Sequence, residues 1–165
     1  MESMDGPEGS TKATLWCGWN DMSSIVNIYI KETWKGALHG SGKAAGMIVY
    51  IDGKGMEHRK IETTQVKDST KNRLHLQIIT KVLHALKCPC SVGIYMDGVG
   101  NIRGCISQGL PEQWKKAGWQ NKRGQGIKNA DIWKLLTPLL NRHEVGIIGY
   151  LDTYDRELEE ALKEE

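Results

Sequence analysis

Two different spacings of apolar residues separate the strands expected in this chain from the helices. Runs of β-branched and aromatic residues predict three strands, at residues 25–30, 45–51 and 56–64. Glycine-rich turn sequences at 36–42 and 52–55 separate these runs. We therefore expect the three strands to be joined by tight turns into an antiparallel meander.

The clearest helical pattern follows Asp68-Ser69-Thr70, a sequence typical of a helix start. Apolar residues then recur at steps of three and four positions, which predicts an amphipathic helix of roughly five turns. These residues are Leu74, Ile78, Ile79, Val82, Leu83 and Leu86. A helix that leads into the next strand favours parallel pairing of that strand with the existing sheet.

The remaining pattern completes a mixed sheet. The predicted elements are a strand at 91–95, short helices at 99–108 and 111–117, a helix after Asn129, a strand at 144–151 and a helix at 154–163. Pro138 should kink or end the helix after Asn129. The predicted order is strand-strand-strand-helix-strand-helix-helix-helix-strand-helix, an α/β arrangement.

Length and composition favour one domain of 25–165, preceded by a flexible or loosely packed segment, 1–24. No apolar run approaches the ~20 residues that cross a membrane, and the first dozen residues lack the apolar part of a secretory signal. The four cysteines form no zinc-binding spacing, and free thiols in Cys88-Pro89-Cys90 would suit a reducing compartment. We expect a cytoplasmic monomer without a membrane partner.

Asp97 is the first candidate for chemistry. It follows a short buried strand and precedes Gly98, and in open α/β sheets ligands bind beyond the carboxyl ends of strands. An aspartate in that position is suited to a metal or phosphate site. The alternative is that Asp97 only caps the helix that begins near Val99.

Charge is distributed unevenly along the chain. Residues 152–165 hold seven acidic and two basic residues, whereas residues 112–134 hold six basic and two acidic residues interleaved with Trp114, Trp119 and Trp133. Basic side chains neutralise phosphates and indoles contact bases or sugars, so residues 112–134 predict a nucleic-acid interface. The alternative is that the indoles belong to the core and the lysines to a solvated face.

Several segments resemble bacterial type 1 ribonuclease H. Trp114–Trp119 and Ile127–Trp133 resemble its basic handle and the helix behind it, and Ser69–Leu74 resembles the polar start of its long helix. Ile28–Ile30 and Tyr95–Gly98 resemble its first and fourth strands. The resemblance extends from residue 25 to the end and is strongest to short versions from Gram-positive bacteria and their mobile elements. It implies a mixed five-stranded sheet with helices on both faces.

The resemblance also implies cleavage of the RNA strand of an RNA–DNA hybrid by four carboxylates that hold two magnesium ions. In this sequence the family's four acidic positions fall on Lys31, with Glu32 beside it, on His75, on Asp97, and near the last helix. The candidates for catalysis are Asp97, Glu32, His75, Asp152 and Asp155, and those for metal binding are Asp97, Glu32, Asp152 and Asp155. Glu157 is a further possibility near the last helix.

Two of these departures oppose magnesium binding. An ammonium at Lys31 would repel the ions and would be able to pair with Asp97, and neutral His75 is a poor magnesium ligand. Glu32 should point to the opposite sheet face from Lys31 unless a bulge redirects it.

The resemblance implies contacts with the hybrid by the helix start, by the turn after Asp97 and by the handle. These residues are Asn72, Arg73, Gly98, Trp114, Lys115, Lys116, Trp119, Lys122, Arg123 and Lys128.

Three hypotheses remain open, and with them whether the protein is an enzyme. The first is a ribonuclease H-like protein that binds RNA–DNA hybrid or related duplex, without a cofactor, having lost or severely weakened hydrolysis. The second is an active enzyme that uses Mg²⁺ or Mn²⁺ held by Glu32, Asp97 and Asp152 or Asp155. The third is a structural pseudonuclease that docks a protein partner through its acidic last helix, which the retained basic residues argue against.

Overall fold

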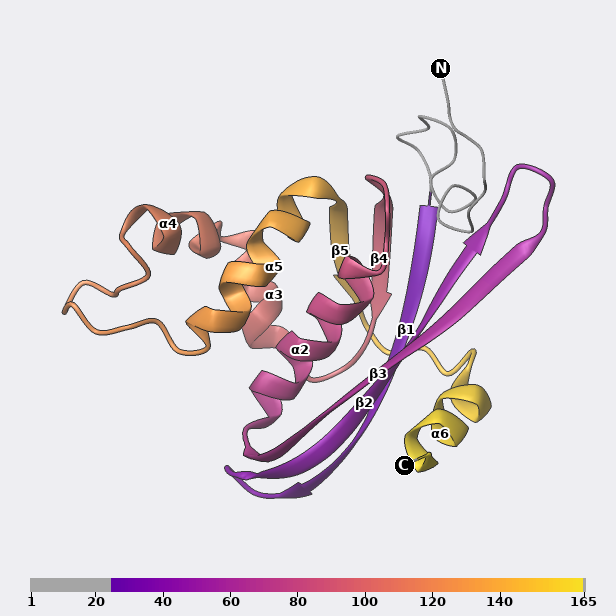
Figure 1. Ribbon diagram of the computed structural model, residues 1–165, viewed down its shortest axis with the longest axis horizontal. Coiled ribbons are helices and arrows are strands. Elements are labelled where there is room, and N and C mark those ends of the chain that lie inside the picture. The colour runs from indigo at the N-terminus through magenta and orange to yellow at the C-terminus, as the bar shows by residue number, and fades with distance from the viewer. Residues whose placement is uncertain (1–24, 165) are drawn as a thin grey trace.

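The computed structural model describes residues 25–164, which form one mixed sheet with helices on both faces (Figure 1). The strands are β1 (Ile25–Gly36), β2 (Gly40–Ile51), β3 (Glu57–Ser69), β4 (Ser91–Tyr95) and β5 (Glu144–Ile148). The helices are α2 (Lys71–His84), α3 (Gly100–Ser107), α4 (Leu110–Lys116), α5 (Ala130–Arg142) and α6 (Asp155–Lys163). The predicted element order is confirmed, and the expectation for residues 1–24 lies outside the described residues.

The sheet has the order β3-β2-β1-β4-β5. β1 pairs antiparallel with β2, and β2 with β3, whereas β4 pairs in parallel with both β1 and β5. Helix α2 connects β3 to β4 across one face of the sheet, and this crossover allows β4 to pair in parallel with β1. The mixed α/β sheet expected from the sequence is therefore confirmed.

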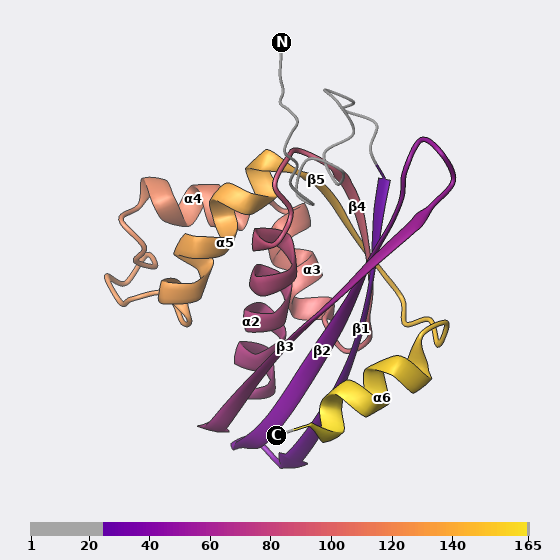
Figure 2. The same cartoon turned by 45° about the vertical axis from the view of Figure 1, so that its right-hand side comes forward.

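The helices cover the two faces of the sheet unequally. Figures 1 and 2 show α2 to α5 on one face and α6 alone on the other. Strand β2 is buried on both sides, because Ala44, Ile48 and Tyr50 join the core under α2 while Met47 and Val49 pack with α6. This two-sided burial explains the unbroken apolar run in β2.

The hairpin between β1 and β2 is longer than the pattern predicted. Both strands continue into the glycine-rich segment expected to be a loop, and Gly36 pairs with Gly40 at its end. Gly36 has a φ of 120°, and a Cβ at Gly40 would lie 2.0 Å from the carbonyl oxygen of Lys35. These glycines allow close backbone approach within the hairpin.

Three other expectations need correction. Of the two effects expected of Pro138, a kink or an end of the helix, the end is wrong, because α5 continues to Arg142. Strand β5 ends at Ile148, before the predicted strand end. Cys90 and Cys105 are free, whereas Cys88 is disulfide-bonded. Within residues 25–164, no helix has the length and apolar character to cross a membrane.

The unequal lengths of β1 and β4 create the place for a site. β4 pairs with β1 only as far as Tyr95 opposite Tyr29, while β1 continues to Gly36. The residues of β1 after Tyr29 therefore form an open sheet edge beyond the end of β4. Side chains from both faces of β1 can reach this edge.

We predict that Gly46→Ala destabilises the fold by about 1–3 kcal/mol, because extra volume in a packed core forces strain. A Cβ at Gly46 would lie 2.7 Å from Cγ1 of Val82, a stiff β-branched residue of α2. The free energy of unfolding in urea measures this effect.

Gly146→Ala is the matched control, because a Cβ at Gly146 in β5 meets nothing within 4 Å. Its free energy of unfolding should stay within about 0.5 kcal/mol of the parent protein or rise slightly. Equal losses for the two variants would contradict the close packing of β2 against α2.

Candidate functional site

A pocket of about 530 Å³ lies at the carboxyl end of β4, beside the middle of β1. Its lining residues are Ile30, Lys31, Glu32, Lys71, His75, Met96, Asp97, Gly98 and Tyr150. The structure thus brings together four residues predicted from sequence, Glu32, His75, Asp97 and Gly98. Lys31 lies among them.

Asp97 follows β4 on an exposed turn. Its carboxylate makes no hydrogen bond or ion pair with residues 25–164. The N-cap residue of α3 is Val99, and no side chain caps that helix. The alternative that Asp97 only caps this helix is therefore wrong, and its carboxylate is free to bind a ligand.

Lys31 carries its charge to the α6 face of the sheet. Its Nζ lies 3.0 Å from Oδ2 of Asp155 and 2.7 Å from Oε2 of Glu159. Hydrogen bonds to Glu159 and to Asp155 raise the pKa of Lys31 well above its usual value. The pairing of Lys31 with Asp97 that the sequence allowed does not form. Side chains alternate along a strand, so Lys31 lies on the same face of β1 as Tyr29, under α6.

The acids considered near the last helix separate in space. Tyr150 donates its hydroxyl hydrogen bond to Asp155, and this bond, followed by the ammonium described above, lowers the pKa of Asp155. Asp152 is exposed and does not line the pocket. Glu157 pairs with Arg59 of β3 at 3.3 Å. Of these three acids, only Asp155 contacts Lys31, which lines the pocket.

Glu32 lies on the opposite face of β1. Pairing with β2 is continuous from Val26 to Gly36, so no bulge redirects Glu32. Its carboxylate forms a short hydrogen bond with Nε2 of His75, a buried residue of α2, and lies 3.5 Å from Nζ of Lys71. Glu32 still lines the Asp97 pocket because β4 ends before it and the pocket opens to both faces of β1.

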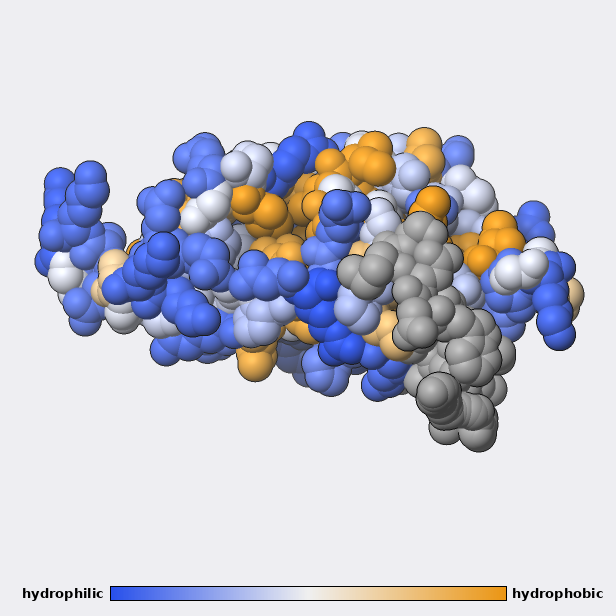
Figure 3. Space-filling model, turned by 90° about the horizontal axis from the view of Figure 1, so that it is seen from above, coloured by the Kyte–Doolittle hydropathy of each residue, from blue (hydrophilic) through white to orange (hydrophobic). Residues whose placement is uncertain are grey.

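The basic handle, residues 114–128, is a mostly exposed projection. Its loop folds back on itself through a bridge between Gln120 and Gly126 and a 2.7 Å hydrogen bond from the Asn121 amide to the Gln125 carbonyl. The exposed cations are Lys115, Lys116, Lys122, Arg123 and Lys128. Hydrophilic residues cover this end of the molecule, on the left in Figure 3.

Other predicted contact residues have structural partners. Arg73 forms a two-pronged ion pair with Asp131, with distances of 3.1 and 2.6 Å, and also donates to Oδ1 of Asn129 at 3.1 Å. Trp114 packs edge-on against Trp133 with ring centroids 5.3 Å apart. The alternative that indoles belong to the core thus holds for Trp133 and partly for Trp114. Asn72 lies half-buried in the first turn of α2.

Sequence reasoning missed three residues at the pocket or beside it. Lys71 lies four positions before His75 on α2, and Glu159 lies four positions after Asp155 on α6. Residues four apart share a helix face, so this spacing was a usable signal. Tyr150 lies in the connection before α6, and no local pattern pointed to it.

Comparisons with known proteins identify the family. A family model described as RNase H matches residues 24–149. A ribonuclease H of Lachnoclostridium phytofermentans is 32% identical over 120 residues, which cover 73% of this chain and 75% of that protein. The chain belongs to the ribonuclease H family.

Solved structures agree with this ribonuclease H fold. LC9-RNase H1, described as a type 1 RNase H with the type 2 active-site motif, aligns with a TM-score of 0.65 at 19% identity, covering 84% of this chain and 70% of that one. The foamy viral protease-reverse transcriptase in complex with RNA/DNA hybrid aligns with a TM-score of 0.57 at 10% identity, covering 98% of this chain and 21% of that one. At these identities the likeness concerns the fold alone.

The side chains at this pocket do not fit a pair of magnesium ions. Among residues 25–164, no three His, Cys, Asp or Glu side chains gather in a way that could hold a metal. The ammonium of Lys31 occupies the space between two carboxylates, and His75 occupies one side of Glu32. Of the two acids that line the pocket, Glu32 and Asp97, only Asp97 has a carboxylate without a partner among residues 25–164.

We predict that Lys31→Met lowers the free energy of unfolding by about 1 kcal/mol at neutral pH, because two carboxylates lose their cation. The pKa of Asp155 is lowered in the folded protein. The stability that Asp155 contributes is therefore present above about pH 4, near the pKa of an unfolded aspartate, and is lost as the pH falls through the pKa of the folded state. The pKa of Lys31 is raised, so the stability that its positive charge contributes is lost only in strong alkali. The difference between variant and parent should therefore shrink by about pH 3.

Urea unfolding at neutral and acidic pH measures this difference. Lys60→Met is the control, because Lys60 pairs only with Glu62, at 3.2 Å, and its side chain is half exposed. This control should lose less stability at neutral pH. An undiminished loss for Lys31→Met in acid would contradict the ion pairs with α6.

Proposed function

We propose that this ribonuclease H family member binds RNA–DNA hybrid or related duplex through its basic handle, and that its hydrolysis is lost or severely weakened. The observation that carries the proposal is the contact of Lys31 Nζ with Asp155 and Glu159, at 3.0 and 2.7 Å. A cation of the protein itself thus stands at one of the family's acidic positions. The hydrogen bond between His75 and Glu32 makes a second internal pair at another.

These pairs oppose the metal-dependent chemistry implied by the family. Magnesium requires oxygen ligands in near-octahedral geometry, and a nearby ammonium both repels the ion and occupies its ligands. A divalent ion would have to displace Lys31 from two carboxylates or His75 from Glu32. Either exchange leaves a partly buried Lys31 or the buried His75 without its partner, which is unfavourable.

The retained basic surface supports nucleic-acid binding. The handle presents five exposed cations, whereas the acidic helix α6 lies across the sheet from it (Figure 1). Basic residues gain affinity by neutralising phosphates and releasing counterions. The foamy viral protease-reverse transcriptase, which shares this fold, has been solved in complex with RNA/DNA hybrid, and this favours hybrid as the ligand to test.

The acidic helix offers less support for protein docking. Asp155 and Glu159 are engaged by Lys31, and Glu157 by Arg59, so these carboxylates already have partners within the fold. We therefore place the docking hypothesis behind nucleic-acid binding.

A second candidate function is a weak hydrolase with a rearranged site that uses Mg²⁺ or Mn²⁺. The observation in its favour is that Glu32 and Asp97 line one pocket. Its weakness is that Glu32 already bonds His75 and contacts Lys71, which leaves Asp97 without a second free acid.

Restoring the two acids provides the sharpest test of lost hydrolysis. The double variant Lys31→Asp, His75→Glu would place four carboxylates near the pocket, and we expect its magnesium-dependent cleavage of labelled hybrid to exceed that of the parent on the order of a hundredfold. Adding Asp97→Asn to the double variant should remove the gain. Cleavage by the parent protein that disappears in Asp97→Asn would favour the rearranged enzyme instead.

Binding is tested separately from cleavage. We predict that Lys122→Ala, Arg123→Ala weakens hybrid binding and reduces the slope of log affinity against log salt by about 2, because two phosphate contacts are lost. Lys54→Ala, in the turn between β2 and β3, removes an exposed cation outside the handle and is the control, which should leave the slope unchanged. Gel shifts over a salt series measure both, and an unaltered slope in the handle variant would contradict the proposed interface.

A further inference from the structure

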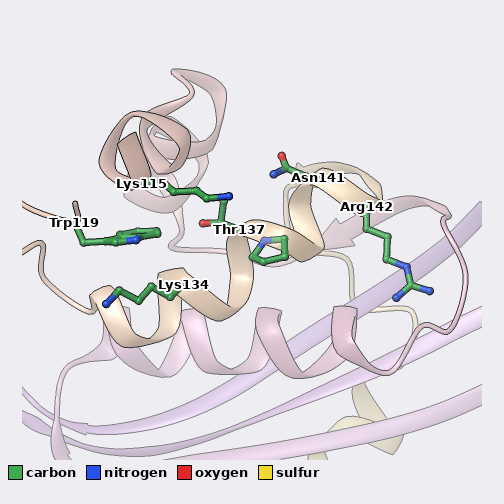
Figure 4. A pocket seen from close by; sticks show the side chains of 7 residues that line it. Lys115, Trp119, Lys134, Thr137, Asn141 and Arg142 are labelled. Atoms are coloured by element: carbon green, nitrogen blue, oxygen red, sulfur yellow. The ribbon is translucent and has the colours of Figure 1, made fainter. Parts of the chain in front are cut away.

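A second cavity, of about 550 Å³, lies between α4 and α5. Figure 4 shows Lys115 and Trp119 on one side of it and Lys134, Asn141 and Arg142 along α5. It shares no lining residue with the Asp97 pocket. We call this cavity the α4–α5 groove.

The charges of the α4–α5 groove favour an anion. Three of its lining residues are cationic and none is acidic. Lys115 and Lys134 make no ion pair with any residue that the structure describes. Arg142 is held in place by donating to the carbonyl of Lys87, a contact that leaves its charge uncompensated.

The indole of Trp119 is held over the groove by a strained backbone. Trp119 has a φ of 64°, a left-handed conformation that is rare for a bulky residue. Its amide donates to the Trp114 carbonyl at 2.7 Å, and its carbonyl accepts from the Ile127 amide at 3.0 Å. Strain of this kind concentrates at ligand sites, where the surrounding structure maintains it.

Trp119 offers both an apolar surface and a neighbouring charge. Its indole is half-buried against the core and lines the groove, and Nζ of Lys134 lies 5.9 Å from its ring centroid. A flat ring beside cations is the arrangement that binds unpaired nucleotides, whose bases stack while their phosphates are neutralised. The interior bases of a duplex are stacked on one another, so only its terminal pairs can present a face to the indole.

The direction of α5 relates this groove to the Asp97 pocket. At the start of α5, Asn129 accepts a hydrogen bond from Arg73, which lies near the Asp97 pocket. At the other end, His143 follows the last helical residue and accepts a hydrogen bond from the amide of Cys90, just before β4. Lys134 and Arg142 are eight residues apart, about 12 Å along the helix. The groove therefore leads away from the Asp97 pocket toward the opposite end of the sheet.

We propose that the α4–α5 groove binds a short unpaired stretch of nucleic acid that extends from a bound duplex. Trp119 would stack one base, while Lys115, Lys134 and Arg142 neutralise neighbouring phosphates. That the bound duplex is an RNA–DNA hybrid rests on the proposed function. Binding of an unpaired strand in the groove is independent of the proposed function.

Fluorescence anisotropy with three labelled oligonucleotides tests this inference: a blunt hybrid, the same hybrid with a single-stranded extension, and the single strand alone. We expect the extension to tighten binding about tenfold. Lys134→Glu should abolish this advantage and weaken binding of the single strand, while Lys54→Glu, with the same charge change in the β2–β3 turn, should retain both. Thermal unfolding of each variant checks that the fold persists.

The outcomes separate the groove from the proposed function. An extension that gives no advantage, or a Lys134→Glu variant that weakens blunt and extended hybrids equally, would overturn the groove assignment. Single-strand binding that depends on Lys134 without any binding of blunt hybrid would uphold the groove and contradict the proposed function.

Discussion

The ammonium of Lys31, held between Asp155 and Glu159, is the contact on which the candidate site depends. It joins the central strand β1 to the last helix and places a fixed positive charge where a metal-dependent site needs a vacancy among carboxylates. The neighbouring residue makes a second link, since Glu32 joins β1 to His75 of α2. Two adjacent residues of one strand thus fasten the helical layers on both faces of the sheet.

These links give carboxylates beside the pocket partners within the protein itself. Clustered carboxylates repel one another unless cations lie among them, and a protein side chain meets that need without a metal. The pocket therefore keeps its shape and one free carboxylate, Asp97, while its other acids are satisfied within the fold. The positive charge of the handle is independent of this change, so nucleic-acid binding and hydrolysis can separate.

The sequence predicted the order of elements because helix and strand spacings are local signals, and burial of β2 on both faces appears as its continuous apolar run. It also predicted that Glu32 and Lys31 face opposite ways. The partners of Lys31 could not be predicted from its neighbours in sequence, because Asp155 and Glu159 are more than 120 residues away and their approach depends on how α6 crosses the sheet. The longer β1–β2 hairpin was missed because its glycines are also typical of a loop.

The central claim is that protein cations have replaced metal ions at this site. Thermal unfolding of the parent protein and of Asp97→Asn, each with and without millimolar Mg²⁺, tests it directly, because an ion that binds only the folded state raises Tm. The account predicts no magnesium-dependent rise in either protein. A rise in the parent protein that disappears in Asp97→Asn would show that the pocket binds the ion and would contradict the account.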